Sequence, residues 1–485
     1  MASQGLPFDV LLLVMEASPL PTAARMSQTC HTLRESGARF LLDRGVSLAS
    51  GDSIISFVQF MCVDPDNRFE HLRSLELACG KIPPPAVDAL LTLISHSSLA
   101  IDSLTLQDAD AMLKSTLVTT PSPPGAIHGG QPDQLPLIDA FTGLTTIRHL
   151  AIRGHCGLHA WRVVKSILSP LKTVSIDFAP LGRGLRVDDL LRRNPILTLA
   201  SHAATLEEIS GKHFAMLPEE DPLGMVPEEH LVHTVYPAVR TITATLSFIL
   251  PPRTLQLIAA FPNLTRLSLT PPVHSSDSGV SSRIERAMAR RHWQRQQQEN
   301  CIPRQTWAHL EELEGSLTDI LALGLLGCHV PMVRLTGALS EPAEYEHVKI
   351  VLGDTRPTGL AITVARVSLF GDMMRPVLSD PSAQQLREME VELVLPPSDR
   401  DLNIEPVLND VAATLALLPL RRVALKLNYD MFGARENSCQ YANSSHVDRD
   451  AKRRVDAAAT LALFREAIPS LVTDVVVKSS RDRAT

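Results

Sequence analysis

The stretch that decides the fold is residues 72–77, which read Leu-Arg-Ser-Leu-Glu-Leu, and it returns at residues 101–106 as Ile-Asp-Ser-Leu-Thr-Leu. Both stretches place apolar residues at the first, fourth and sixth positions of a six-residue phrase. The alternation at the end of the phrase is that of a β-strand with one buried face. We therefore expect each copy of the phrase to form one short strand of a repeat.

The phrase recurs along the chain at irregular intervals. Other clear copies are Ile147/Leu150/Ile152, Leu171/Val174/Ile176 and Leu264/Leu267/Leu269. Weaker copies are Val239/Ile242/Ala244, Leu386/Met389/Val391, Leu420/Val423/Leu425 and Leu471 running into Val475, Val476 and Val477. Starts about 24 to 50 residues apart are typical of a degenerate repeat with loop insertions.

Helical patterns fill the gaps between the phrases. Apolar residues recur every three or four positions over residues 87–94 and again over 404–418. Strands that alternate with helices predict a parallel sheet. With repeats this short we expect an α/β fold in which a curved parallel sheet carries outer helices, an irregular solenoid instead of a closed domain.

Residues 6–48 predict a module of three short helices. The first spans Pro7 to Ala17, with Pro at its start and Asp9 in its first turn. The second spans residues 22–33 and the third residues 38–46. The apolar run over residues 10–15 covers nearly the whole circumference of a helix, so this helix requires burial on two sides. A module of about 45 residues buries little by itself, so we expect a partner chain or the rest of the protein to stabilise it.

The run Leu6-Pro7-Phe8-Asp9-Val10-Leu11, followed by Val14-Met15, Pro19 and the helix to Leu33, resembles the F-box. Residues 56–77 are similar to the linker between F-box and repeats in many fungal F-box proteins, and the recurring phrase resembles leucine-rich repeats. The resemblance implies an F-box that binds a Skp-type adaptor and, through it, a cullin of a ubiquitin ligase. It also implies that the repeats hold an unidentified protein substrate.

The resemblance further implies which residues contact the adaptor. They are the apolar positions that match the family motif, namely Leu6, Pro7, Val10, Leu11, Val14, Met15, Pro19 and Met26. Ser18, Ala23 and Thr29 depart from the family by being less apolar, and each loses contact area worth roughly 25 cal/mol per Å². The alternative is therefore an interaction scaffold in which a vestigial F-box only caps the first repeat.

The repeats depart from the family as well. Its Asn or Cys after the last apolar position is Gly80, His155 and Pro272 in three copies. Without an amide ladder for the turning backbone, we expect irregular bends that are rich in loops.

Domain boundaries follow from these patterns. We expect the F-box-like module over residues 1–48, a helical linker over 49–70 and the repeats over 71–485, with loop insertions near 119–136, 216–230 and 273–300. The last insertion carries Arg283, Arg286, Arg290, Arg291 and Arg295. We interpret this basic run as a solvated face, with docking of an acidic partner or substrate as the alternative.

Composition argues against several classes of protein. Lys plus Arg number 46 against 53 for Asp plus Glu, so no basic excess points to nucleic acid. The seven cysteines are odd in number, scattered and never spaced as C-x-x-C, which favours a reducing compartment, the cytoplasm or the nucleus. The longest uncharged apolar stretch, residues 320–333, falls short of a membrane span.

We expect no catalytic, cofactor or metal site. His149, His155, Cys156 and His159 form the densest group of metal-ligand residue types, but they lack the paired spacing of structural zinc sites, so we interpret them as loop residues. Cys30 falls on the apolar stripe of the second expected helix and is interpreted as a small core residue. An enzyme with an unrecognised site ranks last among the alternatives, and the chain is expected not to be an enzyme.

Overall fold

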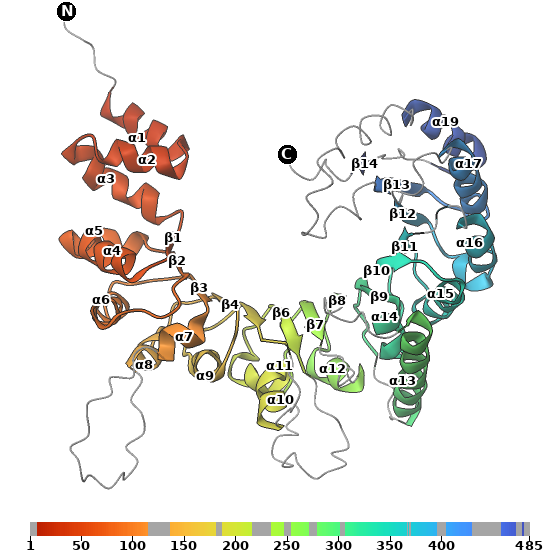
Figure 1. The fold of residues 1–485 in the computed structure, drawn as a ribbon, viewed down its shortest axis with the longest axis horizontal. Coiled ribbons are helices and arrows are strands. Elements are labelled where there is room, and N and C mark those ends of the chain that lie inside the picture. The colour runs from red at the N-terminus through yellow and green to blue at the C-terminus, as the bar shows by residue number, and fades with distance from the viewer. Residues whose placement is uncertain are drawn as a thin grey trace, which may run out of the picture. The chain divides into compact units, whose positions relative to one another are not determined.

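The computed structural model describes residues 7–114, 136–180, 187–215, 234–246, 254–270, 279–300, 306–365, 367, 370–394, 404–428, 457–471 and 478–479. The chain forms two compact units that divide between Val239 and Arg240. Each unit is α/β, with parallel strands in chain order and its helices on one side of them (Figure 1). The insertion expected near 216–230 lies outside the described residues, as does the one expected near 119–136 except for Pro136, which begins a helix.

The first unit begins with three helices, α1 (Phe8–Ala17), α2 (Leu20–Ser27) and α3 (His31–Leu42). The expected boundary between the second and third helices is wrong. Helix α2 ends at Ser27, and Cys30 is the N-cap of α3, where its Sγ accepts a hydrogen bond from the Leu33 amide at 3.5 Å. Cys30 is also exposed, so it is not a core residue. Strand β1 (Val46–Leu48) follows α3 where the third helix was expected to end.

Parallel strands alternate with helices through the rest of the first unit. Its further elements are α4 (Gly51–Val63), α5 (Pro65–Arg68), η1 (Phe69–His71), β2 (Ser74–Leu77), α6 (Pro84–Ile94), β3 (Ser103–Gln107), α7 (Ala109–Lys114), α8 (Pro136–Thr142), β4 (His149–Arg153), α9 (Leu158–Ser166), β5 (Thr173–Asp177), α10 (Val187–Arg193), α11 (Pro195–Thr198), η2 (Ala200–His202) and β6 (Glu208–Phe214). The strands share one register, so Leu75, Leu104, Leu150, Val174 and Ile209 form a buried row.

The second unit repeats the same plan. Its elements are β7 (Thr241–Leu246), α12 (Thr254–Ala260), β8 (Arg266–Thr270), α13 (Val280–Asn300), β9 (Glu312–Ser316), α14 (Leu317–Leu323), β10 (Met332–Leu339), α15 (Pro342–Thr355), β11 (Gly359–Val364), α16 (Phe370–Leu378), η5 (Pro381–Ala383), β12 (Glu388–Val394), α17 (Ile404–Leu415), β13 (Arg422–Asn428), α19 (Ala457–Ala467) and β14 (Lys478–Ser479). A buried row again crosses it, including Ile242, Leu267, Leu313, Val333, Leu360, Met389 and Val423.

A backbone junction fixes this register in both units. The carbonyl of the residue before a strand accepts the amides of the two residues that open the next repeat. Asp102 thus accepts from Arg148 at 2.8 Å and from His149 at 3.0 Å, and Arg387 accepts from Arg421 at 2.7 Å and from Arg422 at 3.1 Å. The turning backbone is satisfied by these shared carbonyls.

Hydroxyl groups also bond the turning backbone at positions near the junction. Thr146 donates to the Ile101 carbonyl and Thr205 to the Leu171 carbonyl, both at 2.8 Å. In the second unit Thr265 donates to Arg240 at 2.9 Å. Threonine side chains thus bond carbonyls of the turning backbone in both units.

The basic run near residues 283–295 lies on α13. Arg291 forms a two-point ion pair with Asp354 of α15 at 2.8 and 2.7 Å, and Arg295 binds the same carboxylate at 3.2 Å. Arg291 and Asp354 side chains are only 16% and 12% exposed. At Arg291 and Arg295 the interpretation as a solvated face is wrong, because both guanidinium groups hold α13 against α15.

Candidate functional site

Helices α1 and α2 carry an exposed apolar face, which we call the N-terminal face. It contains Val10, Leu13, Val14 and Leu20, which are 37%, 63%, 45% and 45% exposed, with the exposed prolines Pro7 and Pro19 beside them. Large apolar side chains that gather on one exposed surface are typical of a docking surface.

The opposite side of α1 packs inward. Met15 is fully buried against α3, where a Cβ on Gly37 would lie 2.5 Å from the Met15 Cε. A larger side chain at this position would have to displace the end of the Met15 side chain, so Gly37 leaves room for Met15. Arg44, just beyond α3, donates hydrogen bonds to the carbonyls of Glu16 and Ser18 and so ties down the end of α1. This packing orients Val10, Leu13 and Val14 away from the core.

The residues expected to contact an adaptor therefore divide by position. Pro7, Val10, Val14 and Pro19 are exposed on the N-terminal face, whereas Leu11 and Met26 are half-buried. Met15 is buried in the module, and Leu6 lies outside the described residues. Sequence reasoning missed Leu13 and Leu20. Leu13 was detectable, since it lies three residues after Val10 and therefore on the same helical face.

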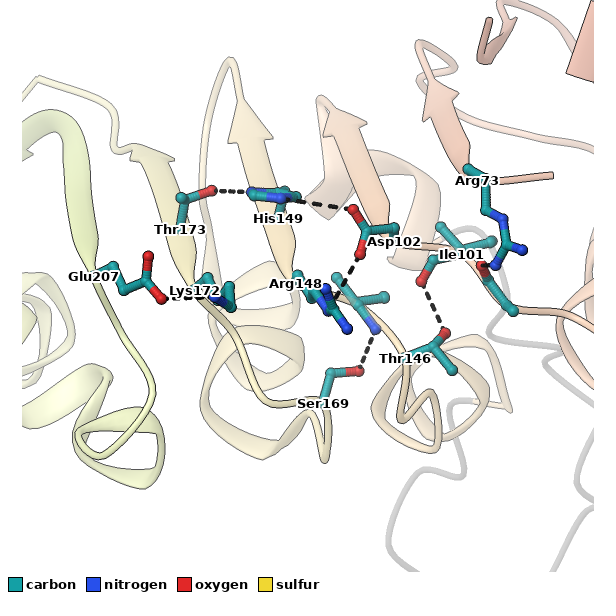
Figure 2. Close-up of polar contacts among 12 residues, drawn as sticks. Arg73, Ile101, Asp102, Thr146, Arg148, His149, Ser169, Lys172, Thr173 and Glu207 are labelled. Atoms are coloured by element: carbon teal, nitrogen blue, oxygen red, sulfur yellow. Dashed lines mark hydrogen bonds and ion pairs between the residues drawn. The ribbon is translucent and has the colours of Figure 1, made fainter. Parts of the chain in front are cut away.

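A second surface rich in polar side chains belongs to the sheet of the first unit. Figure 2 shows these side chains near the beginnings of its strands. Asp102 lies 3.5 Å from Arg148 and 3.6 Å from the His149 Nε2, and the His149 Nδ1 lies 2.8 Å from the Thr173 Oγ1. Lys172 donates to Glu207 at 2.7 Å, and this contact holds the pKa of Glu207 below its usual value. The charges on this surface are thus largely paired with one another.

Thr173, His149 and Asp102 are in a hydroxyl–imidazole–carboxylate order like that of hydrolytic enzymes. Two observations argue against catalysis here. The His149 and Asp102 side chains are 45% and 43% exposed, so water is not excluded. The amides of His149 and Thr173 are bonded to the carbonyls of Asp102 and Arg148, so they are not free to stabilise an oxyanion.

The polar face of the second unit's sheet is charged. Arg334 of β10 binds Glu312 of β9 at 2.8 Å and Glu390 of β12 at 2.7 Å. It reaches Glu390 by crossing β11 at Ala361, whose methyl group leaves room for the guanidinium group. Glu312 also binds Arg266 at 2.9 Å. Burial alone would raise the pKa of Glu390, but the hydrogen bonds and charge of Arg334 outweigh it and lower that pKa.

The described residues hold no group of three or more His, Cys, Asp or Glu side chains arranged for a metal ion. Burial, with the nearby Asp110 carboxylate, raises the pKa of the Cys156 thiol to about 12, so this thiol is protonated at neutral pH and a poor nucleophile. Burial likewise raises the pKa of Cys79 and Cys328. His155, by contrast, lies exposed beside Cys156.

Comparisons with known proteins add no relative. The sequence matches no family model, and no curated protein is similar to it. Among the helices that the structure describes, none is both long and apolar enough to cross a membrane. What the fold defines is a class, an α/β protein with a parallel sheet and outer helices.

Proposed function

We propose that this chain is a non-catalytic substrate receptor of a cullin-type ubiquitin ligase. Its N-terminal helices would be an F-box that binds a Skp-type adaptor, and the parallel strands and outer helices of its two units would be degenerate leucine-rich repeats that hold the substrate protein. The contribution of such a receptor to the reaction is proximity, which raises the effective concentration of the substrate near the ubiquitin-charged enzyme.

The observation that carries this proposal is the N-terminal face. Val10, Leu13 and Val14 are held outward by a helix whose other side is anchored through Met15. The small module leaves these side chains in water, at a cost of roughly 25 cal/mol for each Å² of apolar surface, and burial against a partner would recover that energy. The resemblance to the F-box implies that this partner is a Skp-type adaptor.

The polar sheet faces supply the substrate side of the proposal. Their side chains alternate with the buried rows, so each strand presents polar groups on the face without helices. These groups would form hydrogen bonds and ion pairs with a folded or extended protein segment. The proposal assigns no substrate residue.

The test is the affinity of the purified full chain for a purified Skp-type adaptor, measured by titration calorimetry. Val10→Asp and Leu13→Asp should each weaken binding by about tenfold or more, because each would place a charge in the apolar contact. Leu168→Asp is the matched control, since Leu168 is 71% exposed but lies after α9, outside the module. Its affinity should equal that of the unaltered chain.

Two results would contradict the proposal. One is the absence of binding at micromolar concentrations by a chain whose circular dichroism shows that it is folded. The other is equal weakening by all three substitutions. Unchanged dichroism of the Val10 and Leu13 variants would show that lost binding is not lost folding.

One observation favours a second candidate, an interaction scaffold that the module only caps. Strand β1 follows α3 directly and pairs with β2 from Val46↔Leu75 to Leu48↔Leu77. The module thereby supplies the strand that covers the edge of β2, as a capping unit of a repeat array does. Under this reading the adaptor would not bind, while removal of residues 1–48 would still destabilise the first unit.

A further inference from the structure

Ser18 and Pro19 form the connection between α1 and α2, at the border of the N-terminal face. Both residues are extended, with φ and ψ of −80° and 151° at Ser18 and −56° and 148° at Pro19. Ser18 is half-buried, and its hydroxyl donates to the Val14 carbonyl, at 2.6 Å, in an exposed setting. An extended serine followed by proline is the form in which a proline-directed protein kinase binds its acceptor.

Another serine–proline pair of the chain lies in a buried environment. Ser169 precedes Pro170, but its side chain is 1% exposed. Its hydroxyl donates to the Leu144 carbonyl at 2.6 Å and accepts from the Ile147 amide at 3.1 Å. The same dipeptide is therefore partly accessible at one place and enclosed at the other, which provides an internal control.

We infer that Ser18 is a phosphorylation site that switches off docking at the N-terminal face. This inference rests on the proposed function for its regulatory part. In the reaction the Ser18 Oγ attacks the γ-phosphorus of a nucleoside triphosphate, the bond from that phosphorus to the bridging oxygen breaks, and the hydroxyl proton passes to a carboxylate of the kinase. The products are phosphoserine and a nucleoside diphosphate.

The position of Ser18 explains why a phosphoryl group would oppose docking. The group carries nearly two negative charges and would lie beside the exposed side chains of Val14 and Leu20, so docking would have to remove those charges from water. It would also lie at the C-terminal end of α1, where the negative end of the helix dipole disfavours an anion.

Arg44 could pair with the phosphoryl group only by giving up contacts that it already makes. Its guanidinium group already donates to the carbonyls of Glu16 and Ser18, so pairing with the new phosphate would take it from the helix end that it holds. Phosphorylation would therefore both charge the N-terminal face and loosen its α1–α2 border. Both effects weaken binding of an apolar partner.

The experiment uses the full chain with Thr120→Ala, Ser122→Ala and Thr270→Ala, which leaves Ser18 and Ser169 as its serine or threonine residues before proline. This chain is treated with a proline-directed kinase and magnesium ATP, and phosphorylation is mapped by mass spectrometry. We expect incorporation at Ser18 and none at Ser169 while the chain is folded. Ser18→Ala should abolish it, and unfolding the chain with denaturant before digestion should expose the Ser169 peptide to the same kinase.

Adaptor affinity of the phosphorylated and unmodified chains is then compared by calorimetry. We expect phosphorylation to weaken binding by about tenfold or more and phosphatase treatment to restore it. Ser18→Leu should bind at least as tightly as the unmodified chain and should not respond to the kinase.

The outcomes separate this inference from the proposed function. If the unmodified chain binds and its phosphorylated form binds equally well, the inference is wrong and the proposed function stands. If the folded chain takes no phosphate at Ser18, the inference is wrong whatever the adaptor does. If the unmodified chain does not bind, the proposed function fails, and the regulatory part of the inference fails with it.

Discussion

The strands of the two units have equivalent backbone positions, but their polar faces carry different side chains. In the middle row of the first unit, Thr105, Ala151, Ser175 and Ser210 are neighbours across β3 to β6. In the corresponding row of the second unit, Glu314, Arg334 and Glu390 occupy β9, β10 and β12. This row of the first unit is thus small and uncharged from β3 to β6, and the ion pair of Lys212 with Asp177 lies outside it. In the second unit Arg334 and Glu390 of the row itself form an ion pair.

The register and the surface chemistry of these repeats are therefore set separately. The register comes from the backbone junction and from the buried rows, which are alike in the two units. The alternate side chains do not enter that core, so they vary without loss of the fold. We expect hydroxyl-based contacts to dominate polar stabilisation in the first unit and charge-based contacts in the second.

The largest expected effect comes from Ser169→Ala in the first unit. The change removes a buried hydroxyl and leaves the Leu144 carbonyl and the Ile147 amide without it, so local stability should fall by about 2–3 kcal/mol. Hydrogen exchange of the peptides around β4 and β5, read by mass spectrometry, measures the loss. Ser470→Ala is the matched control, because Ser470 is exposed and bonds only the Leu420 carbonyl. A loss that changes strongly with salt would contradict the expectation that hydroxyl groups dominate polar stabilisation in the first unit.

Arg334→Met is the counterpart in the second unit. It removes the half-buried ion pairs with Glu312 and Glu390, so we expect a loss of about 1–2 kcal/mol at low salt that shrinks as ionic strength rises. Exchange of the β9 to β12 peptides at two salt concentrations is the measurement. The control is Arg422→Met, since Arg422 is 61% exposed and lies 3.7 Å from Glu388. An equal loss in both variants would contradict the role of Arg334.

Acid should affect the two units at different pH. His202 is buried in the first unit, and burial lowers its pKa below the ordinary 6.5. The unfolded chain therefore binds a proton that the folded chain does not, so stability of this unit should begin to fall as pH drops below about 6.5. The Glu390 pKa is lowered below 4.5, so its contribution is full above that pH and is lost only as pH falls through the lower folded value.

Peptide-resolved exchange at stepped pH checks this order. His202→Gln should remove the earlier loss in the first unit, provided that the variant is as stable as the unaltered chain at pH 8. Simultaneous onset in both units would overturn the assignment to His202.

The smallest expected effect is that of Arg153→Gln. Arg153 is 63% exposed and lies 3.9 Å from Glu76 across β3. Exposed pairs at such distances contribute little, so we expect a change within about 0.5 kcal/mol at any salt concentration. Denaturant unfolding suffices for this measurement, and a larger loss would mean that charge also matters at the centre of the first face.

The sequence predicts the parallel α/β class well, because the apolar phrase marks most strands that the structure describes. It fails where one residue of the phrase is replaced. In β6 and β9 the sixth position is Gly211 and Gly315, and before β11 the first position is Pro357. Gly315 and Pro357 are nevertheless buried and Gly211 is half-buried, which a pattern of apolar residues does not reveal. The complete phrase at β10 was missed because it lies in a long apolar run.

The candidate site was predictable only in part. Spacing along one helix indicates that Val10 and Val14 share a face, but it does not say which face a neighbouring helix covers. That choice depends on a contact between α1 and α3, in which the Met15 side chain packs against Gly37. The α2–α3 boundary was missed for a similar reason, since Cys30 acts as a cap and sulfur is a weak acceptor that sequence rules seldom assign to this position.

The junction carbonyls have a consequence for how the chain tolerates change in length. Each junction sets the start of one strand against the strand before it, so a register error does not accumulate along the sheet. A segment inserted between two phrases alters the path between junctions and not the alignment of the strands that follow. Gene variants with longer or shorter connections should therefore keep every buried row in place, and new loops can be acquired without redesign of the core.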